Sequence, residues 1–244
     1  MDLLAARPLA DRAITFDLAP RIGAEAAARV GAAHARLAEL LEAGALPGAR
    51  ELSRAFCSIT LHYDPLEGRQ ADLVARVRAA LEKTDPAAPV AGRLWRLPCC
   101  YEGKDLDDLS ERLGIKRAQI AERHAATEHR VYAIGFLPGL PFMGELPEGF
   151  SVPRRETPRT RVPQGAVAIA NGLTVIYPFE SPGGWHIVGR CPVPLFDAAR
   201  AAPALLEAGD RVRFDPVGHD RFEEIAADLA AGRIEAARYA EDTP

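Results

Sequence analysis

Glycine and proline are concentrated in one part of this sequence. Residues 130–200 hold 19 of the 40 glycines and prolines in the 244-residue chain. Proline lacks the amide donor that a strand interior needs, and glycine readily adopts turn conformations, so both residues interrupt regular structure. Their density therefore predicts many short strands joined by tight turns, as in a barrel or a sandwich.

The first 90 residues have a different pattern, in which strands alternate with helices. Apolar residues recur at every second position from Ala55 to Tyr63, which indicates a strand with one buried face. We expect strands over residues 14–18 and 52–63, and helices over residues 22–42 and 70–83. This order predicts a small α+β domain over residues 1–88, with its helices on one face of a sheet.

The remaining residues, 89–244, predict a second, all-β domain. Two short helices are expected within it, over residues 105–113 and 116–126, and a helical tail over residues 221–240. The expected strands cover residues 90–97, 131–136, 166–170, 173–177, 186–189 and 211–214. The chain as a whole is therefore predicted to be an α+β domain followed by a β-barrel with inserted helices.

Composition excludes several classes of protein. The net charge of −4 gives no electrostatic reason to bind nucleic acid. No run approaches the roughly 20 apolar residues of a membrane helix, and the N-terminus does not resemble a signal peptide. We therefore expect a cytoplasmic protein without membrane or nucleic-acid partners.

Common catalytic and metal-binding motifs are missing from the sequence. The four cysteines form no CxxC pair, so we expect small buried residues and no structural zinc. The sequence has no phosphate-binding loop, dinucleotide fingerprint, HExxH or GxSxG motif, and no Met-Lys-Met that would carry biotin. His124 and His129 are five residues apart and do not share a helix face, so we expect solvated or capping side chains.

Three segments of the glycine- and proline-rich stretch contain residues suited to a site. The first, residues 135–144, is a rigid apolar loop that includes Phe136 and forms either a structural corner or the wall of a pocket or partner surface. The second, residues 153–163, has four arginines, and Arg155, Arg159 and Arg161 share one side of an extended backbone. It forms either an anion site or a charged edge strand.

The third segment, residues 177–190, surrounds a Ser-Pro-Gly-Gly turn. Its exposed amides can bind an anion and Glu180 can act as a base or acceptor. Histidine, here His186, is the residue type whose unperturbed pKa lies near neutrality. Period two places Arg190 on the same strand face as His186. The alternative is a plain hairpin with Trp185 in the core.

The order and spacing of four motifs resemble the allophanate hydrolase subunit 1 family. The motifs are GFLPGLPFMGELP, PRRETPRTRVPQGAVAIA, IYPFESPGGWHIVGRCPVPLFD and LLEAGDRVRFDPV. That family includes the B-type subunit of bacterial 5-oxoprolinase, the Kip-type inhibitor of sensor histidine kinases, and the carboxyltransferase module of urea carboxylase.

The resemblance implies a cyclophilin-like second domain and a subunit role. It implies action with a homologous C-type subunit and an ATP-using A-type subunit, in the ATP-dependent cleavage of 5-oxoproline to glutamate. ATP would then serve through the complex, with no metal or biotin on this chain. The alternatives are a Kip-type inhibitor that binds a sensor kinase and a carboxyltransferase-type subunit of a urea carboxylase or allophanate system.

These observations together predict a site on the second domain. Glu180 and His186 are expected to be catalytic. The expected substrate-binding residues are Phe136, Arg159, Arg161, Tyr177, Ser181, Gly183, Gly184 and Arg190.

Overall fold

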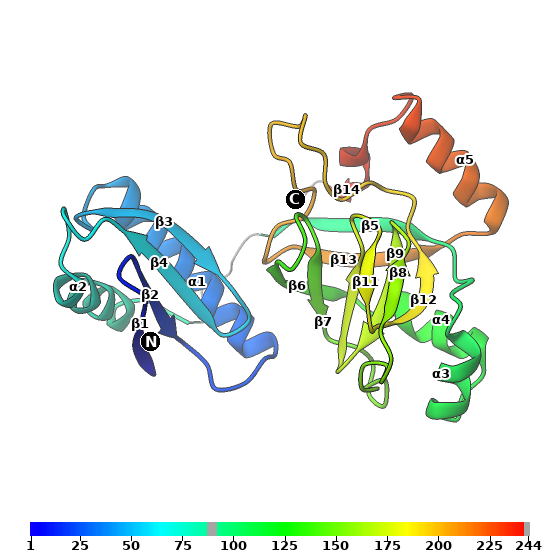
Figure 1. Cartoon of the computed structure of the whole chain (residues 1–244), viewed down its shortest axis with the longest axis horizontal. Helices are drawn as coiled ribbons and strands as arrows, with labels where there is room; N and C mark the ends of the chain where they lie inside the picture. Colours follow the sequence, from blue (N-terminus) through cyan, green and yellow to red (C-terminus); the bar gives the residue numbers. More distant parts are fainter. Residues whose placement is uncertain (87–91, 242–244) are drawn as a thin grey trace. The chain divides into compact units, whose positions relative to one another are not determined.

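The structure is a computed structural model that describes residues 1–86 and 92–241. The chain divides into two compact units, Met1–Ala91 and Gly92–Pro244 (Figure 1). The domain boundary predicted between residues 88 and 89 lies outside the described residues. No helix among the described residues is long and apolar enough to cross a membrane.

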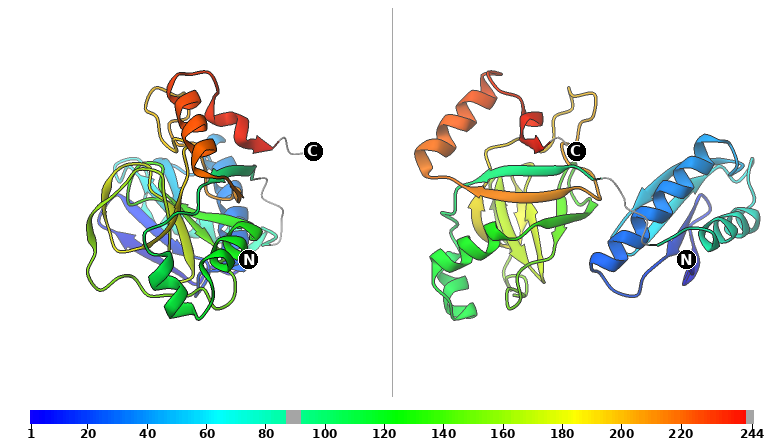
Figure 2. Two further views of the ribbon diagram at one scale, coloured as in Figure 1. Left: turned by 90° about the vertical axis from the view of Figure 1, so that its right-hand side faces the viewer. Right: turned by 180° about the vertical axis from the view of Figure 1, so that it is seen from behind.

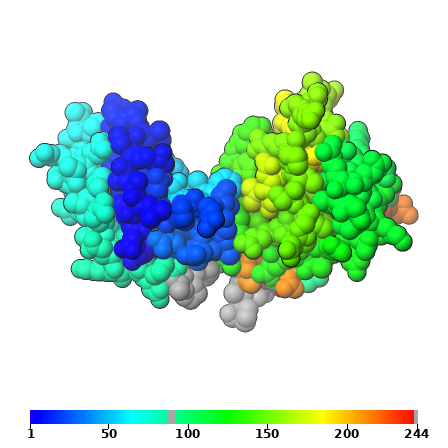
Figure 3. Space-filling model, turned by 90° about the horizontal axis from the view of Figure 1, so that it is seen from below, coloured from blue at the N-terminus to red at the C-terminus, as the bar shows by residue number. Residues whose placement is uncertain are grey.

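The first unit is a four-stranded antiparallel sheet with two helices. The strands lie in the order β1-β2-β4-β3. The elements are β1 (Ala5–Leu9), β2 (Ala13–Asp17), α1 (Ala24–Glu42), β3 (Ala49–Arg54), β4 (Ser58–Tyr63) and α2 (Gln70–Glu82). The edge strand β1 is largely exposed and lies in the dark blue segment on the surface of this unit (Figure 3).

The core of the first unit follows from alternation along β2 and β4. Ile14 and Phe16 are fully buried and pack with α1 and α2 in one apolar cluster. The intervening Thr15 faces the other way, where its hydroxyl lies 2.9 Å from that of Thr60. The single strand predicted over residues 52–63 is wrong, because a turn at residues 55–57 divides it into the antiparallel pair β3 and β4.

The second unit is built on an eight-stranded sheet in the order β12-β9-β10-β7-β6-β13-β5-β14. A separate pair joins β8 and β11. The strands are β5 (Leu94–Cys99), β6 (His129–Ile134), β7 (Pro141–Gly144), β8 (Arg159–Val162), β9 (Ala166–Ala170), β10 (Leu173–Ile176), β11 (Ser181–Gly183), β12 (His186–Arg190), β13 (Arg211–Pro216) and β14 (Ala240–Glu241). Strands β5 and β13 are parallel neighbours that run across the ends of the other strands, so the sheet is strongly curved (Figures 1 and 2).

Strand β9 shows how this sheet is packed on both faces. Val167 and Ile169 belong to the main core cluster on one face. The alanines at the alternate positions 166, 168 and 170 lie in a second cluster on the other face. The small alanine side chains leave room there for the loop before β7 and for the β8–β11 pair, which carry the predicted site segments.

Helices cover parts of the second unit. They are α3 (Leu106–Leu113), α4 (Arg117–Ala126) and α5 (His219–Ala230). The helical tail predicted over residues 221–240 is interrupted after α5, and a 3₁₀ turn over Ala236–Tyr239 leads into β14. Strands β7, β8, β11 and β14 are too short for their periodicity to be recognised in the sequence.

His124 and His129 correct another expectation, because both are fully buried instead of solvated. The two imidazole rings pack with centroids 4.7 Å apart, and each also packs against the ring of Phe214. His124 Nδ1 lies 2.8 Å from the Tyr101 hydroxyl and Nε2 lies 3.1 Å from the Thr174 hydroxyl. The two histidines therefore form a polar centre within the core.

Candidate functional site

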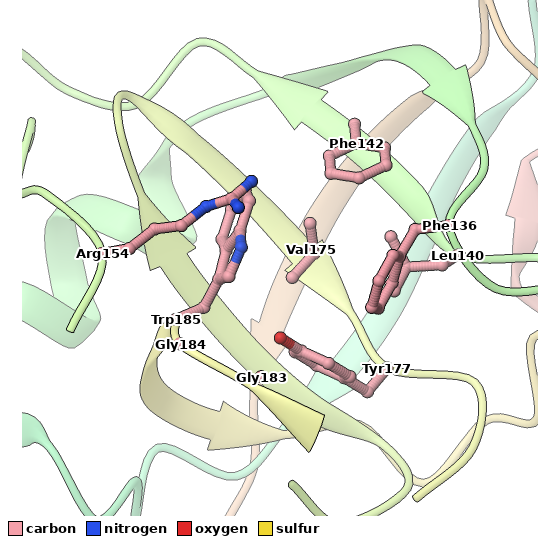
Figure 4. Close-up of a pocket in the computed structure, with 9 residues that line it drawn as sticks. All are labelled: Phe136, Leu140, Phe142, Arg154, Val175, Tyr177, Gly183, Gly184 and Trp185. Carbon is pink, nitrogen blue, oxygen red and sulfur yellow. The ribbon is translucent and has the colours of Figure 1, made fainter. Parts of the chain in front are cut away.

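A cavity of about 100 Å³ opens on the second unit at the face where the β9 alanines lie. It brings together the loop before β7, the segment before β8, strand β10 and the turn between β11 and β12 (Figure 4). Its lining residues are Phe136, Leu140, Phe142, Arg154, Val175, Tyr177, Gly183, Gly184 and Trp185. Four of the predicted site residues therefore meet in one pocket: Phe136, Tyr177, Gly183 and Gly184.

The loop before β7 places Phe136 at the rim of this pocket. Hydrogen bonds from Gly135 N to Leu140 O and from Leu140 N to Leu137 O close the loop. Phe136 has a φ of 69° and is 72% exposed. A bulky residue is rarely found in the left-handed region, where its Cβ crowds the backbone. Such strain at an exposed aromatic residue is typical of binding sites.

The Tyr177 side chain lies in close contact with the backbone of Gly183. A Cβ on Gly183 would lie 2.3 Å from the Tyr177 hydroxyl, so only glycine allows this approach. The Tyr177 hydroxyl points into the cavity (Figure 4) although the residue as a whole is 2% exposed. Burial raises the pKa of Tyr177, and the nearby charges of Arg154 and Arg159 offset this only in part. The hydroxyl is therefore protonated at neutral pH and available as a hydrogen-bond donor.

The four arginines of the second segment have different surroundings. Arg155 and Arg159 both donate hydrogen bonds to the carboxylate of Asp105, which is 3% exposed. Arg161 is exposed and pairs with Glu180 at 2.7 Å. These three guanidinium groups are therefore occupied by protein carboxylates.

Arg154 is the arginine left for a ligand. Its guanidinium lies 5.6 Å from the centroid of the Trp185 ring, at the wall of the pocket (Figure 4). It makes no ion pair with any residue that the structure describes. An arginine on an aromatic face, without a carboxylate partner, is well suited to hold the carboxylate of a small ligand.

The arginine strand and the glycine turn are neighbours, as the predicted site requires. Strand β8 pairs with β11, with Ser181 opposite Val162 and Gly183 opposite Arg159. Only the turn side of this pair contributes to the cavity, because the arginine side chains of β8 leave it for Asp105 and Glu180. The predicted anion site on Arg159 and Arg161 is therefore not what the geometry shows.

The remaining predicted site residues also lie outside the cavity lining. Glu180 is on the surface in its pair with Arg161, and the Ser181 hydroxyl lies 3.4 Å from Pro182 O. His186 is 1% exposed, with Nε2 2.9 Å from Pro153 O. Trp185 enters the cavity, so its neighbour His186 points to the opposite face of the strand.

Arg190 is separated from His186 by an irregularity in β12, where the register shifts between Ile187 and Gly189. Its guanidinium lies 4.8 Å from the centroid of the Phe222 ring on α5. There it lines a second cavity of about 340 Å³, formed mainly by the segment 190–195 and one face of α5. Period two fails for this pair because the bulge adds a residue.

Two residues important to this region, Arg154 and Asp105, were not among the predicted site residues. Arg154 belongs to a recognised arginine cluster, but the sequence does not show which of four arginines lacks a carboxylate partner. Asp105 precedes α3 and resembles an ordinary helix cap. Its Oδ2 instead accepts a hydrogen bond of 2.6 Å from Ile187 N, so it joins α3 to β12.

The chemistry of the small cavity is that of a binding pocket. Its described lining contains no carboxylate, imidazole or thiol, the groups that bind metals or transfer protons at neutral pH. The aromatic rings, the Arg154 guanidinium and the Tyr177 hydroxyl instead match a compact ring-shaped ligand with a carboxylate and a hydrogen-bond acceptor.

Comparison with solved structures identifies relatives of the fold. The crystal structure of TTHA0988 is 35% identical, with a TM-score of 0.73 over 84% of this chain, and the match covers 40% of the TTHA0988 chain. PH0987 from Pyrococcus horikoshii is 31% identical with a TM-score of 0.53, and the match covers 89% of this chain and all of PH0987. The urea amidolyase of K. lactis, 20% identical over 94% of this chain and 16% of its own, has a TM-score of 0.73 and shares the fold.

Comparison with curated proteins identifies 5-oxoprolinase subunits as relatives of this chain. The B-type 5-oxoprolinase subunit of Escherichia coli O157:H7 is 32% identical over 211 residues, which cover 85% of this chain and 94% of that protein. The protein of the same name from Haemophilus influenzae is 38% identical over 162 residues, 65% of this chain and 72% of its own. A family model described as carboxyltransferase domain, subdomain C and D, matches residues 4–206. The chain belongs to this carboxyltransferase-domain family and is a homologue of the B-type subunits of 5-oxoprolinase.

Proposed function

We propose that this chain is a subunit of an ATP-dependent 5-oxoprolinase, which acts in the cytoplasm with a homologous second subunit and an ATP-using third subunit. The observation that carries this proposal is the 32% identity to a B-type 5-oxoprolinase subunit over 94% of that protein. The pocket supports it, because 5-oxoproline is a small ring that bears one carboxylate and one lactam carbonyl.

Within this proposal, residues that line the pocket have roles in binding the substrate. The guanidinium of Arg154 binds the substrate carboxylate, and the Tyr177 hydroxyl donates a hydrogen bond to the lactam carbonyl. The rings of Trp185 and Phe142, whose centroids lie 6.0 Å apart, cover the apolar part of the five-membered ring. Glu180 and His186, first expected to be catalytic, have no place in this pocket.

The reaction needs groups that this pocket does not contain. The lactam C–N bond breaks as one water adds to the carbonyl carbon and supplies the proton on the new amine. A second water releases phosphate from the phosphorylated carboxyl group, so that ATP ends as ADP and phosphate. Phosphorylation of the lactam oxygen by ATP makes the carbonyl carbon electrophilic. Because the described lining lacks an acid or base other than Tyr177, these groups come from the partner subunits, and the chain alone is inactive.

The second unit also fits the cyclophilin-like barrel that the resemblance implies. Its strongly curved sheet surrounds one apolar cluster, which joins β5 and β13 to β9 and β12. Shape by itself carries no function, so this proposal concerns the scaffold only.

The proposal is tested by copurifying the chain with its homologous subunit and measuring glutamate formed from 5-oxoproline and ATP with all subunits present. We expect activity in the complete complex and none in this chain alone.

Within the complex, Arg154→Met should raise the KM for 5-oxoproline at least tenfold. Arg161→Met, which removes an exposed arginine already paired with Glu180, should change this KM less than twofold. Tight binding to a sensor kinase without 5-oxoprolinase activity would support the inhibitor alternative and contradict the proposal.

A further inference from the structure

Three potential metal ligands meet on the second unit away from the small cavity. Cys100 directly follows β5, Glu102 lies two residues further on, and His219 is the first residue of α5. Their ligand atoms all lie within 4.8 Å of one another. The segments that carry them are far apart in the sequence, so no local spacing predicts this group.

We propose that Cys100, Glu102 and His219 form a zinc site that fastens the start of α5 to the segment after β5. A thiolate, an imidazole and a carboxylate form a ligand set that zinc accepts, whereas magnesium and calcium prefer oxygen ligands alone. Three protein ligands leave the fourth tetrahedral position to water.

One of the three distances within the group already matches a tetrahedral ion, and the other two are at most 4.8 Å. With metal–ligand bonds of about 2.0–2.3 Å, two ligand atoms of one tetrahedral zinc ion are about 3.5 Å apart. His219 Nδ1 and Glu102 Oε2 already lie 3.5 Å apart. These two side chains are 62% and 65% exposed and free to adjust, whereas Cys100 is 5% exposed and held in place.

The backbone around Cys100 makes it a rigid anchor for the ion. Cys100 N donates to Arg190 O and Arg190 N donates to Cys100 O, both at 2.9 Å. The guanidinium of Arg190 rests over the Phe222 ring, 4.8 Å from its centroid, on the first turns of α5. The cysteine is therefore fixed relative to the helix that carries His219.

The charges near Cys100 determine how easily the thiol gives up its proton. Burial raises the pKa of the Cys100 thiol and Glu102 raises it further, whereas Arg190 lowers it. A bound zinc ion removes the disfavoured negative charges by pairing with both the thiolate and the carboxylate.

In this proposal a metal ion attaches α5 to the rest of the unit, in addition to the apolar packing of the helix. Among the residues described for this helix, Phe222 and Ile225 are buried against the rest of the unit. Helix α5 also lies beyond the residues 4–206 that the family model matches. His219 therefore lies outside the matched part of the chain, whereas Cys100 and Glu102 lie inside it.

The test uses the full chain, stripped with a chelator and titrated with Co²⁺ alone as a spectroscopic substitute for zinc. We expect one equivalent to produce the visible absorption of a tetrahedral site and a thiolate-to-cobalt charge-transfer band, both removed by added Zn²⁺. Cys100→Ser should abolish the charge-transfer band, and His219→Gln should weaken cobalt binding at least tenfold. Cys57→Ser, which removes a half-buried cysteine of the first unit, should leave both unchanged.

Folding of the variants is checked by their far-ultraviolet circular dichroism and melting temperature. We also expect Zn²⁺ to raise the melting temperature of the wild-type chain but not that of folded His219→Gln. A wild-type chain without the charge-transfer band at one equivalent of Co²⁺ would overturn the proposal. The same conclusion would follow if the band persisted in Cys100→Ser.

Discussion

At the scale of single residues, the pocket depends on two unusual positions, Gly183 and Phe136. Gly183 has no space for a Cβ because of the Tyr177 hydroxyl, whereas Phe136 keeps a left-handed backbone despite its bulky side chain. Each position involves only a few atoms, so single substitutions at Gly183 and Phe136 test these two descriptions.

We predict that Gly183→Ala destabilises the second unit by about 1–3 kcal/mol, because the new methyl group must displace Tyr177. Gly184→Ala is the matched control, since the nearest atom to its Cβ would lie at 3.6 Å, an ordinary contact. Both tryptophans, Trp95 and Trp185, belong to the second unit, so denaturant unfolding followed by tryptophan fluorescence reports on that unit. Equal stability of the two variants would refute the close approach of Gly183 and Tyr177.

Phe136 gives a second prediction, which separates the backbone from the side chain. Phe136→Gly should be more stable than Phe136→Ala by about 1 kcal/mol, because glycine removes the cost of the positive φ and alanine does not. The comparison is made by the same fluorescence-detected unfolding. If alanine proved the more stable of the two, the loop would not hold this conformation in solution.

At the scale of the elements, Asp105 joins α3, β12 and the segments that carry Arg155 and Arg159. It precedes α3 but uses its carboxylate for long-range contacts and makes no side-chain cap. One buried carboxylate thus keeps two arginines out of the pocket, which leaves Arg154 as its cation. The position of these elements therefore determines the charge of the site.

We predict that Asp105→Asn destabilises the second unit by about 3–5 kcal/mol, because it leaves the two arginines without their buried counter-charge. Asp107→Asn is the control two residues later, where a 78% exposed carboxylate pairs with Arg117. Its cost should be below about 1 kcal/mol. Comparable losses in the two variants, measured by denaturant unfolding, would show that Asp105 does not hold these elements together.

At the scale of the whole molecule, the two units have separate cores, and the second contains the buried pair His124 and His129. Burial lowers the pKa of His129 from 6.5 to about 4, although hydrogen bonds with His124 and Glu145 act in the other direction. Burial also lowers the pKa of His124 well below its ordinary value. Both imidazoles are therefore neutral in the folded unit.

This arrangement predicts a loss of stability in acid. Between about pH 6.5 and pH 4 the unfolded chain binds a proton at His129 that the folded chain does not, so the free energy of unfolding falls as the pH falls. The destabilisation due to His129 is about 3 kcal/mol, complete near pH 4 and absent above pH 7. Fluorescence-detected unfolding across this range should show a smaller slope for His129→Gln than for the wild-type chain.

The control for this experiment is His219→Gln, measured without divalent metals, because His219 is 62% exposed. Its pH dependence should match that of the wild-type chain. A wild-type slope retained in His129→Gln would mean that other groups cause the acid sensitivity.

Several features could be predicted from local patterns of residues. A run rich in alanine and leucine without proline predicted the helix over residues 22–42, and apolar periodicity predicted the helix over residues 70–83. The density of glycine and proline marked the segments that build the pocket. The order of four motifs determined the family. Each helix, each turn segment and each single motif is contained within a short window of sequence, where the same side-chain sizes and backbone preferences act in any tertiary context.

Which charged and polar groups are available to a ligand depends instead on contacts between distant segments. No residue that the structure describes forms an ion pair with Arg154, whereas Arg159 pairs with Asp105, 54 positions away. His124 is buried because β10 and β13 enclose it, and Cys100 meets His219 because α5 returns to the end of β5. Such pairings depend on how distant segments pack, so they cannot be predicted from a short window of sequence.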